Sequence, residues 1–125
     1  MHALRHVHEL LVPGGTLVDV HPVTQEQVET PEGPIGVIEE SEWISVDLPN
    51  TEARLGESIR AGLYALEAET EYDVLQHFDS VDELIEAKRD LLEGQPSLVR
   101  RIKKATPPLV TREHIVLRRL SACPT

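Results

Sequence analysis

Apolar residues recur along the chain with two different spacings, which together predict a mixture of helices and strands. Between residues 3 and 11, most of the apolar side chains fall on one face of a helix. Pro13-Gly14-Gly15 ends this helix, and residues 16–20 form a short, mostly apolar run typical of a buried strand. The first predicted elements are therefore a helix, a tight turn and a strand that ends at His21-Pro22.

The middle of the chain has a less regular pattern. Residues 23–34 are polar and contain two prolines, so this stretch is predicted to be a loop. Residues 35–48 mix apolar and acidic side chains and predict an extended hairpin that turns near 39–42. A helix capped by Asn50 or Thr51 is expected next. Its apolar face is expected to consist of Leu55, Ile59, Leu63 and Leu66.

The second half of the chain has clearer signals. Residues 67–78 alternate between charged and less polar side chains, which is the period of a half-exposed strand. Ser80 and Glu83 have the spacing of a capping box and predict a helix, and Pro96 is placed to begin another. A last strand is expected over 109–120. The expected fold class is therefore α+β, in a single domain spanning residues 1–125.

Charge is distributed unevenly along the sequence and narrows the range of partners. The formal net charge is −10, although nine of the 12 Lys and Arg residues lie between Lys88 and Arg119. Phosphate backbones and anionic membranes are bound by clustered cations, so the overall charge argues against nucleic acid or a membrane as the main partner. The basic cluster at 100–104 has no interleaved aromatic residues and is interpreted as a solvated helix face.

Cysteine content and hydropathy suggest a location. Cys123 is the only cysteine, which excludes a disulfide framework within the chain and a set of zinc thiolates. The amino-terminal residues lack the apolar core of a signal peptide, and no apolar run reaches the roughly 18 residues needed to cross a bilayer. We expect a cytoplasmic protein.

Two candidate ligand sites, one for a metal and one for a phosphate, have little support from the sequence. His2 and His6 have the i, i+4 spacing that can bind a metal on a helix, but no third ligand follows from a motif, so no metal is predicted. Gly14-Gly15-Thr16 lies between a helix and a strand, whereas a phosphate-binding loop lies between a strand and a helix. The glycines are better explained by the end of a helix and a tight turn.

Candidate catalytic groups are equally unsupported by spacing. Glu39, Glu40 and Glu42 offer paired carboxylates, but an acidic surface turn explains them as well. None of the serines lies in a Gly-x-Ser-x-Gly turn. The residues by themselves therefore predict no catalytic site.

One segment of the sequence resembles a known protein family. The segment from Ala3 to Val20, with its Pro-Gly-Gly turn, looks like the helix, turn and fifth strand of class I S-adenosylmethionine-dependent methyltransferases. In that family a helix, a sixth strand and a final strand follow, and the last two form an antiparallel hairpin. The predicted elements have the same order. Further segments similar to bacterial members are 40–43, 59–63, 78–84 and 112–120.

The resemblance implies a carboxyl-terminal half, with a partial Rossmann-like fold, that lacks the cofactor-binding half. The family binds S-adenosylmethionine through a Gly-rich turn after its first strand and acidic residues that follow, and the sequence has none of these. No cofactor is therefore expected to bind this chain alone, although S-adenosylmethionine would bind if a partner completed the fold. The implied substrate contacts are His21, Trp43 and Tyr64. Each also has a structural explanation, as the end of a strand or as part of the core.

Two functions follow as hypotheses. The chain is either the substrate-side part of a methyltransferase, inactive alone and completed by a complementary half, or a non-enzymatic, homo-oligomeric interaction module derived from that fold. An incomplete sheet of this kind would expose a strand edge that either partner must cover. A small independent enzyme of unrelated α+β fold is the third possibility.

Overall fold

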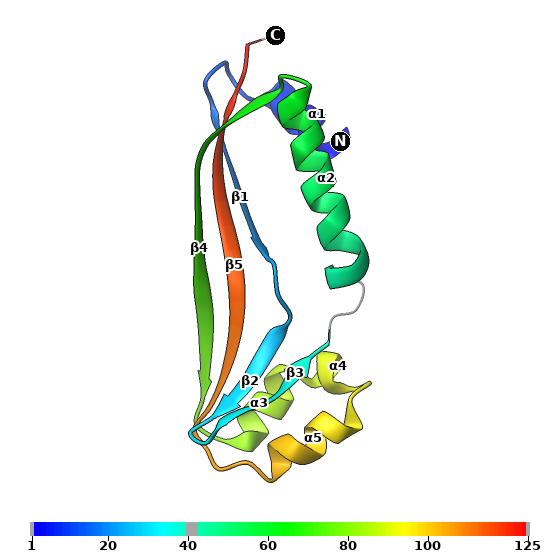
Figure 1. Cartoon of the computed structure of the whole chain (residues 1–125), viewed down its shortest axis with the longest axis vertical. Coiled ribbons are helices and arrows are strands. Elements are labelled where there is room, and N and C mark those ends of the chain that lie inside the picture. Colours follow the sequence, from blue (N-terminus) through cyan, green and yellow to red (C-terminus); the bar gives the residue numbers. More distant parts are fainter. Residues whose placement is uncertain (1, 40–42, 125) are drawn as a thin grey trace. The chain divides into compact units, whose positions relative to one another are not determined.

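A computed structural model describes residues 2–39 and 43–124, with only the backbone described for His2 and Trp43. Five α-helices, one π-helical turn (η1) and five strands are described within these ranges (Figure 1). In chain order they are α1 (His2–Leu10), β1 (Thr16–Pro22), β2 (Glu26–Thr30), β3 (Gly33–Ile38), η1 (Trp43–Asp47), α2 (Leu48–Arg60), β4 (Tyr64–Phe78), α3 (Val81–Ala87), α4 (Arg89–Leu92), α5 (Pro96–Lys103) and β5 (Leu109–Ala122). The fold is α+β, with an open antiparallel sheet.

The last strand, β5, organises the sheet. β1, β2 and β4 all pair with β5, and β3 pairs with β2. β2 is antiparallel to β5 with Val28 opposite Thr111, and antiparallel to β3 with Gln27 opposite Val37. β4 is also antiparallel to β5, because Glu67, Glu69 and Asp73 on β4 contact Ser121, Arg118 and Arg112 on β5 in that order. The backbone N–H of Cys123 donates to the carbonyl of Leu63, just before β4, at 2.9 Å.

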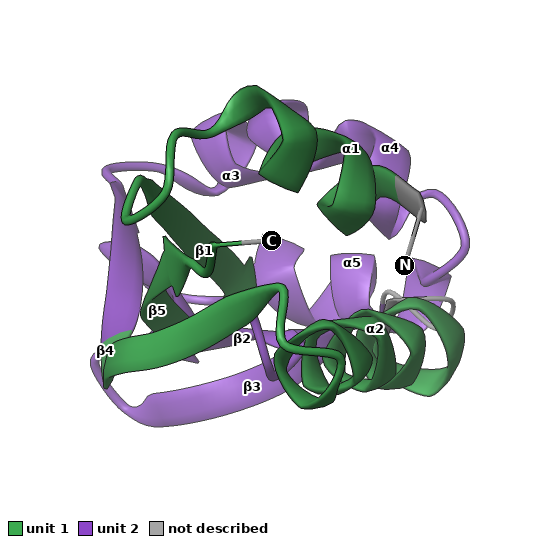
Figure 2. Ribbon diagram, turned by 90° about the horizontal axis from the view of Figure 1, so that it is seen from above, with its two compact units in different colours: residues 1–21, 41–72, 115–125 green, residues 22–40, 73–114 purple. Residues whose placement is uncertain are grey.

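The chain divides into two compact units, coloured separately in Figure 2. Unit 1 comprises residues 1–21, 41–72 and 115–125, and unit 2 comprises residues 22–40 and 73–114. Unit 1 contains α1, α2, most of β1 and the adjoining parts of β4 and β5. Its core is small and mostly aliphatic, with one tyrosine. The buried members are Leu55, Leu63, Tyr64, Leu120 and Ala122.

Unit 2 contains β2, β3 and helices α3 to α5, and its core is larger. The buried members are Val28, Ile38, Phe78, Leu84, Leu92, Leu98, Ile102 and Leu109. Two polar links join its helices to its strands. Lys88, between α3 and α4, lies 3.0 Å from the buried carboxylate of Glu26 on β2. The side-chain amide of Gln95 accepts from the Glu39 N–H at 2.8 Å and donates to the Val37 carbonyl at 3.0 Å, as a neighbouring strand would.

Elements with strong periodicity were predicted correctly. These are the first helix with its Pro-Gly-Gly end, the strand that follows, the long strand before Ser80, the helix from Pro96 and the last strand. Gly14 has a φ of 78°, a left-handed conformation that glycine adopts without steric cost. The Ser80 hydroxyl accepts from the Glu83 N–H at 3.2 Å, as the capping box predicted. The helix predicted to follow Ser80 is divided at Lys88 into α3 and α4.

Two predictions for the middle of the chain were wrong. Residues 23–34 are not a loop, because they contain β2 and the start of β3. The predicted hairpin near 39–42 is also incorrect, since residues 43–47 are π-helical and lead directly into α2, while residues 40–42 lie outside the described part.

The boundaries of α2 also differ from prediction. The helix begins at Leu48, ahead of Pro49, with no side-chain cap. It ends at Arg60, and Gly62 follows with a φ of 77°, so Leu63 and Leu66 lie outside it. The left-handed glycine turns the chain into β4. None of the described helices is long and apolar enough to cross a membrane.

Candidate functional site

A polar cluster on the inner face of unit 1 has the most chemically connected side chains. Alternation along β1 directs Leu17, Asp19 and His21 to this face, whereas Val18 and Val20 are exposed on the other. α2 contributes Glu52 and β5 contributes Arg118. The cluster therefore joins a strand, a helix and the last strand through side chains alone.

His21 is almost fully buried, with 6% of its surface exposed, and both ring nitrogens face carboxylates. Nδ1 lies 3.2 Å from Oδ1 and 3.0 Å from Oδ2 of Asp19, and Nε2 lies 2.9 Å from Oε1 of Glu52. An ionised carboxylate only accepts hydrogen bonds, so a ring nitrogen that carries a proton donates it to the acid beside it. A substrate can reach a ring nitrogen only by taking the place of one of these carboxylates.

Arg118 holds three carboxylates together. Its Nη1 lies 3.0 Å from Glu52 and 3.5 Å from Asp19, and its Nε lies 2.9 Å from Glu69 on β4. Burial alone would raise the pKa of Glu52, but hydrogen bonds from Arg118 and His21 outweigh it and lower that pKa. Burial opposes the charge of Arg118, yet its bonds to Glu52 and Glu69 raise its pKa. The charged forms are therefore mutually stabilised.

Tyr64 occupies a separate position in unit 1, in the core beneath α1. Its hydroxyl donates to the carbonyl of Leu4 at 2.8 Å, and burial raises its pKa. The ring of His8 meets the ring of Tyr64 edge to face at 5.5 Å, while His8 Nε2 lies 2.9 Å from the carbonyl of Cys123. These contacts fix α1 against the end of β5.

Unit 2 contains a second network of charged side chains, centred on Arg112, which is more exposed than Arg118. Arg112 on β5 bonds to Glu29 on β2 at 2.7 Å and to Asp73 on β4 at 2.9 Å. Asp73 also contacts His114 Nδ1 at 2.8 Å. The bond from His114, followed by that from Arg112, lowers the pKa of Asp73, and Glu29 and then Asp73 raise the pKa of Arg112. A shallow depression of about 440 Å³ adjoins these residues.

The residues named as substrate contacts have different surroundings. His21 belongs to the cluster around Arg118, and Tyr64 belongs to the core. Trp43 is the first residue of η1, and its side chain lies outside the described part. Of the acidic candidates, Glu39 is exposed, whereas Glu40 and Glu42 fall outside the described residues.

Metal binding has no support from the described side chains. His6 is exposed and lies 3.9 Å from Glu9, and the side chain of His2 is not described. Within residues 2–39 and 43–124, no group of three or more His, Cys, Asp or Glu side chains is arranged to hold a metal ion. The clusters described above are therefore networks of hydrogen bonds and ion pairs.

Sequence reasoning missed the two arginines that organise these clusters. A signal was available, because Glu67, Glu69, Glu71 and Asp73 recur with a period of two on one predicted strand, and the next predicted strand contains Arg112 and Arg118. An antiparallel pair would bring these opposite charges together. No protein-family model matches the chain, and a search of curated proteins also found no match.

Proposed function

We propose that this chain is the substrate-side, carboxyl-terminal region of a class I S-adenosylmethionine-dependent methyltransferase, inactive until a complementary half supplies the cofactor site. The order of elements carries the proposal. A helix, a Pro-Gly-Gly turn and β1 are followed by α2 and then by β4 and β5, which pair with each other. The resembling family has the same order at its carboxyl-terminal end. β2, β3 and α3 to α5 are extra elements on this framework.

Exposure along β1 supports a missing neighbour. Among the described strands, β1 pairs only with β5, and its outer residues Val18 and Val20 are 54% and 51% exposed. Leu10 and Val12, at and just after the end of α1, are more exposed still. Apolar surface of this kind is normally covered by another layer or chain. The complementary half would cover it by adding strands and helices beside β1.

His21 has a role in this proposal at the carboxyl end of β1. Ligands of open α/β sheets bind beyond the carboxyl ends of the strands, so this position would face the methyl acceptor. The bonds to Asp19 and Glu52 fix the ring, and we propose that it orients the acceptor by exchanging one of those bonds for a contact to it. S-adenosylmethionine itself would be held by the complementary half.

Cofactor binding tests the proposal directly. Titration calorimetry of the chain alone with S-adenosylhomocysteine is expected to give no saturable heat at concentrations that reveal a Kd of about 100 μM. A mixture with a polypeptide that carries the Gly-rich turn and first four strands of a class I methyltransferase is expected to bind. Saturable binding by the chain alone would overturn the proposal.

A matched pair of variants tests where the complementary half docks. Val20→Lys places a charge on the outer face of β1 and is expected to abolish binding by the mixture. Val46 is equally exposed, at 51%, but lies on η1 in the same unit, so Val46→Lys should leave binding intact. Equal effects of the two variants would argue against β1 as the docking strand.

β4 favours the second function, a homo-oligomeric interaction module. All of its residues from 65 to 77 are exposed, including Leu66, Tyr72, Val74 and Leu75. Among the described strands it pairs only with β5, so one edge is open to another chain. Light scattering should find a dimer that Val74→Lys dissociates, with no cofactor binding in any mixture, if this function is the correct one.

A further inference from the structure

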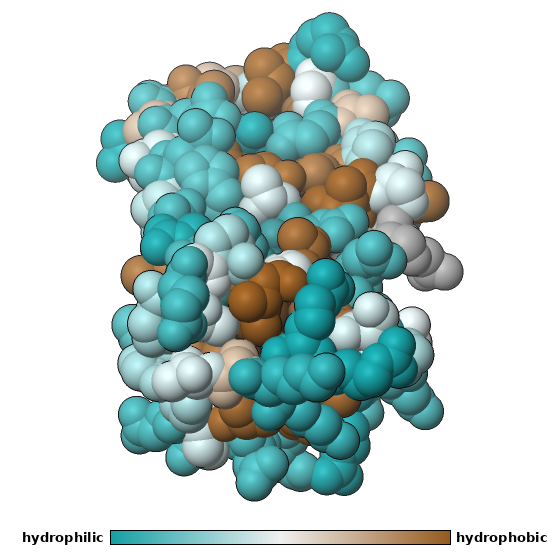
Figure 3. All heavy atoms as spheres, turned by 60° about the horizontal axis from the view of Figure 1, so that its bottom comes forward, coloured by the Kyte–Doolittle hydropathy of each residue, from teal (hydrophilic) through white to brown (hydrophobic). Residues whose placement is uncertain are grey.

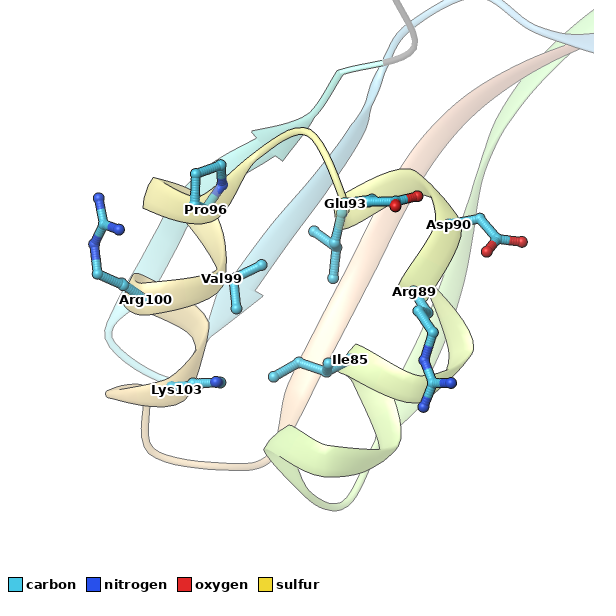
Figure 4. Close-up of a pocket in the computed structure, with 9 residues that line it drawn as sticks. Ile85, Arg89, Asp90, Glu93, Pro96, Val99, Arg100 and Lys103 are labelled. Atoms are coloured by element: carbon cyan, nitrogen blue, oxygen red, sulfur yellow. The ribbon is translucent and has the colours of Figure 1, made fainter.

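Helices α3, α4 and α5 of unit 2 enclose a surface hollow of about 590 Å³. We call it the helical hollow, and its lining residues are drawn in Figure 4. Small-molecule pockets fall in a range of roughly 300–1,000 Å³, so the volume suits a small organic ligand. All lining residues belong to unit 2, independently of the clusters around Arg118 and Arg112.

The floor of the hollow is apolar. Leu92 is 2% exposed, and Ile85 and Val99 are half-buried at the edge of the core. Figure 4 shows Ile85 of α3 and Val99 of α5 pointing into the same space. Figure 3, which turns the lower end of Figure 1 forward, shows apolar atoms reaching the surface between hydrophilic ones. An apolar ligand body would find aliphatic contacts from all three helices.

The charged residues around the hollow are not equivalent. Arg89 lines the hollow and pairs with Glu86. Asp90, Glu93 and Arg100 point away from the space between Ile85 and Val99 in Figure 4. Lys103 lines the hollow from the last turn of α5, and no described residue forms an ion pair or hydrogen bond with its ammonium group. An unpaired ammonium beside an apolar floor attracts an anion.

We propose that the helical hollow binds a small anionic amphiphile, a monocarboxylate with an unbranched apolar body. The body lies on Ile85, Leu92 and Val99, and the carboxylate accepts from Lys103. An apolar floor with a few polar groups at its edge is the usual form of such a site. The site does not depend on the methyltransferase proposal, because it uses no residue of β1, α2 or β4.

α5 itself supplies a matched control. Lys103 and Lys104 are adjacent and have the same charge, but Lys104 lies over a different depression, which Thr30 and Ile35 also line. Lys103→Gln and Lys104→Gln therefore change the net charge equally. Of the two, only Lys103→Gln removes a cation that lines the helical hollow. Both side chains are exposed, so both variants should fold, which circular dichroism would check.

The test is an NMR titration of the full chain with decanoate, below the concentration at which decanoate self-associates. We expect saturable shifts at the amides of Ile85, Leu92 and Val99, with a Kd below about 1 mM. Lys103→Gln should weaken binding by about tenfold, the loss expected for one charge-assisted hydrogen bond, and Lys104→Gln by less than about twofold. Decyltrimethylammonium, with the opposite charge, should bind much more weakly.

Three results would overturn the proposal. The first is a lack of saturable shifts at the three floor residues. The second is an equal effect of the two lysine substitutions, which would indicate general attraction to a basic helix. The third is equal binding of decyltrimethylammonium, which would indicate a hollow that selects only for apolar bodies. None of these results bears on S-adenosylhomocysteine binding, so the two proposals fail separately.

Discussion

Arg118 and Arg112 lie six residues apart on β5, and carboxylates surround each of them, but their exposure differs. The side chain of Arg118 in unit 1 is 14% exposed, and that of Arg112 in unit 2 is 40% exposed. Coulomb attraction is weaker in water and stronger in a buried site. The cost of leaving a charge without its partner is also larger in a buried site. The two arginines therefore make similar bonds but are expected to contribute unequally to the stability of the fold.

The partners of the two residues do not show this difference, because Glu52 and Glu69 are 37% and 45% exposed, and Glu29 and Asp73 are 25% and 38% exposed. Arg118 joins Glu52 of α2 to Glu69 of β4, and one of these acids also holds the buried ring of His21. Arg112 joins Glu29 to Asp73 near solvent. Removing Arg118 would take a mostly buried guanidinium away from Asp19 and Glu52, which also hold the buried ring of His21, whereas water can replace the more exposed Arg112. Unit 1, which has the smaller core, thus relies more on its polar cluster.

The largest expected effect comes from removing each arginine while keeping its length. Arg118→Met should lower the free energy of unfolding by about 2 kcal/mol, because it removes a mostly buried guanidinium that bonds to two carboxylates. Arg112→Met should lower it much less, as is usual for exposed ion pairs. Urea denaturation followed by circular dichroism measures both. Equal losses would mean that burial does not distinguish the two clusters.

The next largest effect is expected in the dependence of folding stability on acidic pH. The pKa of Glu52 is lower in the folded chain than in the unfolded chain, so the carboxylate stabilises the fold above its unfolded pKa. That stability is lost as the pH falls from about 4.5 through the folded pKa. Glu52→Gln should therefore flatten the dependence of stability on pH below about 4.5.

Asp73 provides the comparison for this titration. Its pKa is also lowered, by His114 and Arg112, so the sign of its contribution is the same. The group is at the surface, and solvent screening reduces what the shift contributes to stability. Asp73→Asn should flatten the curve less than Glu52→Gln does. A larger effect from Asp73→Asn would contradict the ranking by burial.

Whether a helix or strand could be predicted from the sequence depends on whether its inward side chains are apolar. α5 was predicted because Leu98, Val99 and Ile102 fall on one face, and β5 because residues 115–117 form an apolar run. β2 was missed because one of its inward positions is Glu26, which Lys88 neutralises from 62 residues away. A buried acid interrupts the alternation that identifies a strand, and its partner is known only from the tertiary structure.

The candidate sites show the same limit. Asp19 and His21 have a spacing of two, which places them on one face of a strand, and this much is visible in the sequence. Their convergence with Glu52 and Arg118 depends on the packing of α2 and β5. Likewise, Lys103 and Lys104 have the same charge in sequence, and only the packing of α5 distinguishes them. Periodicity assigns a side chain to a face but does not identify its partner.

Salt should produce the smallest effect and the finest distinction between the two arginines. Coupling energies from double-mutant cycles would be measured for Arg118 with Glu69 and for Arg112 with Asp73, in about 0.05 M and 1 M NaCl. At 1 M the screening length falls to about 3 Å, which weakens exposed pairs more than buried ones. The coupling energy of Arg112 with Asp73 should lose most of its value, while that of Arg118 with Glu69 changes less. If both couplings fell in the same proportion, the Arg118 cluster would be as accessible to ions as the Arg112 cluster, and its larger effect on stability would have to come from packing.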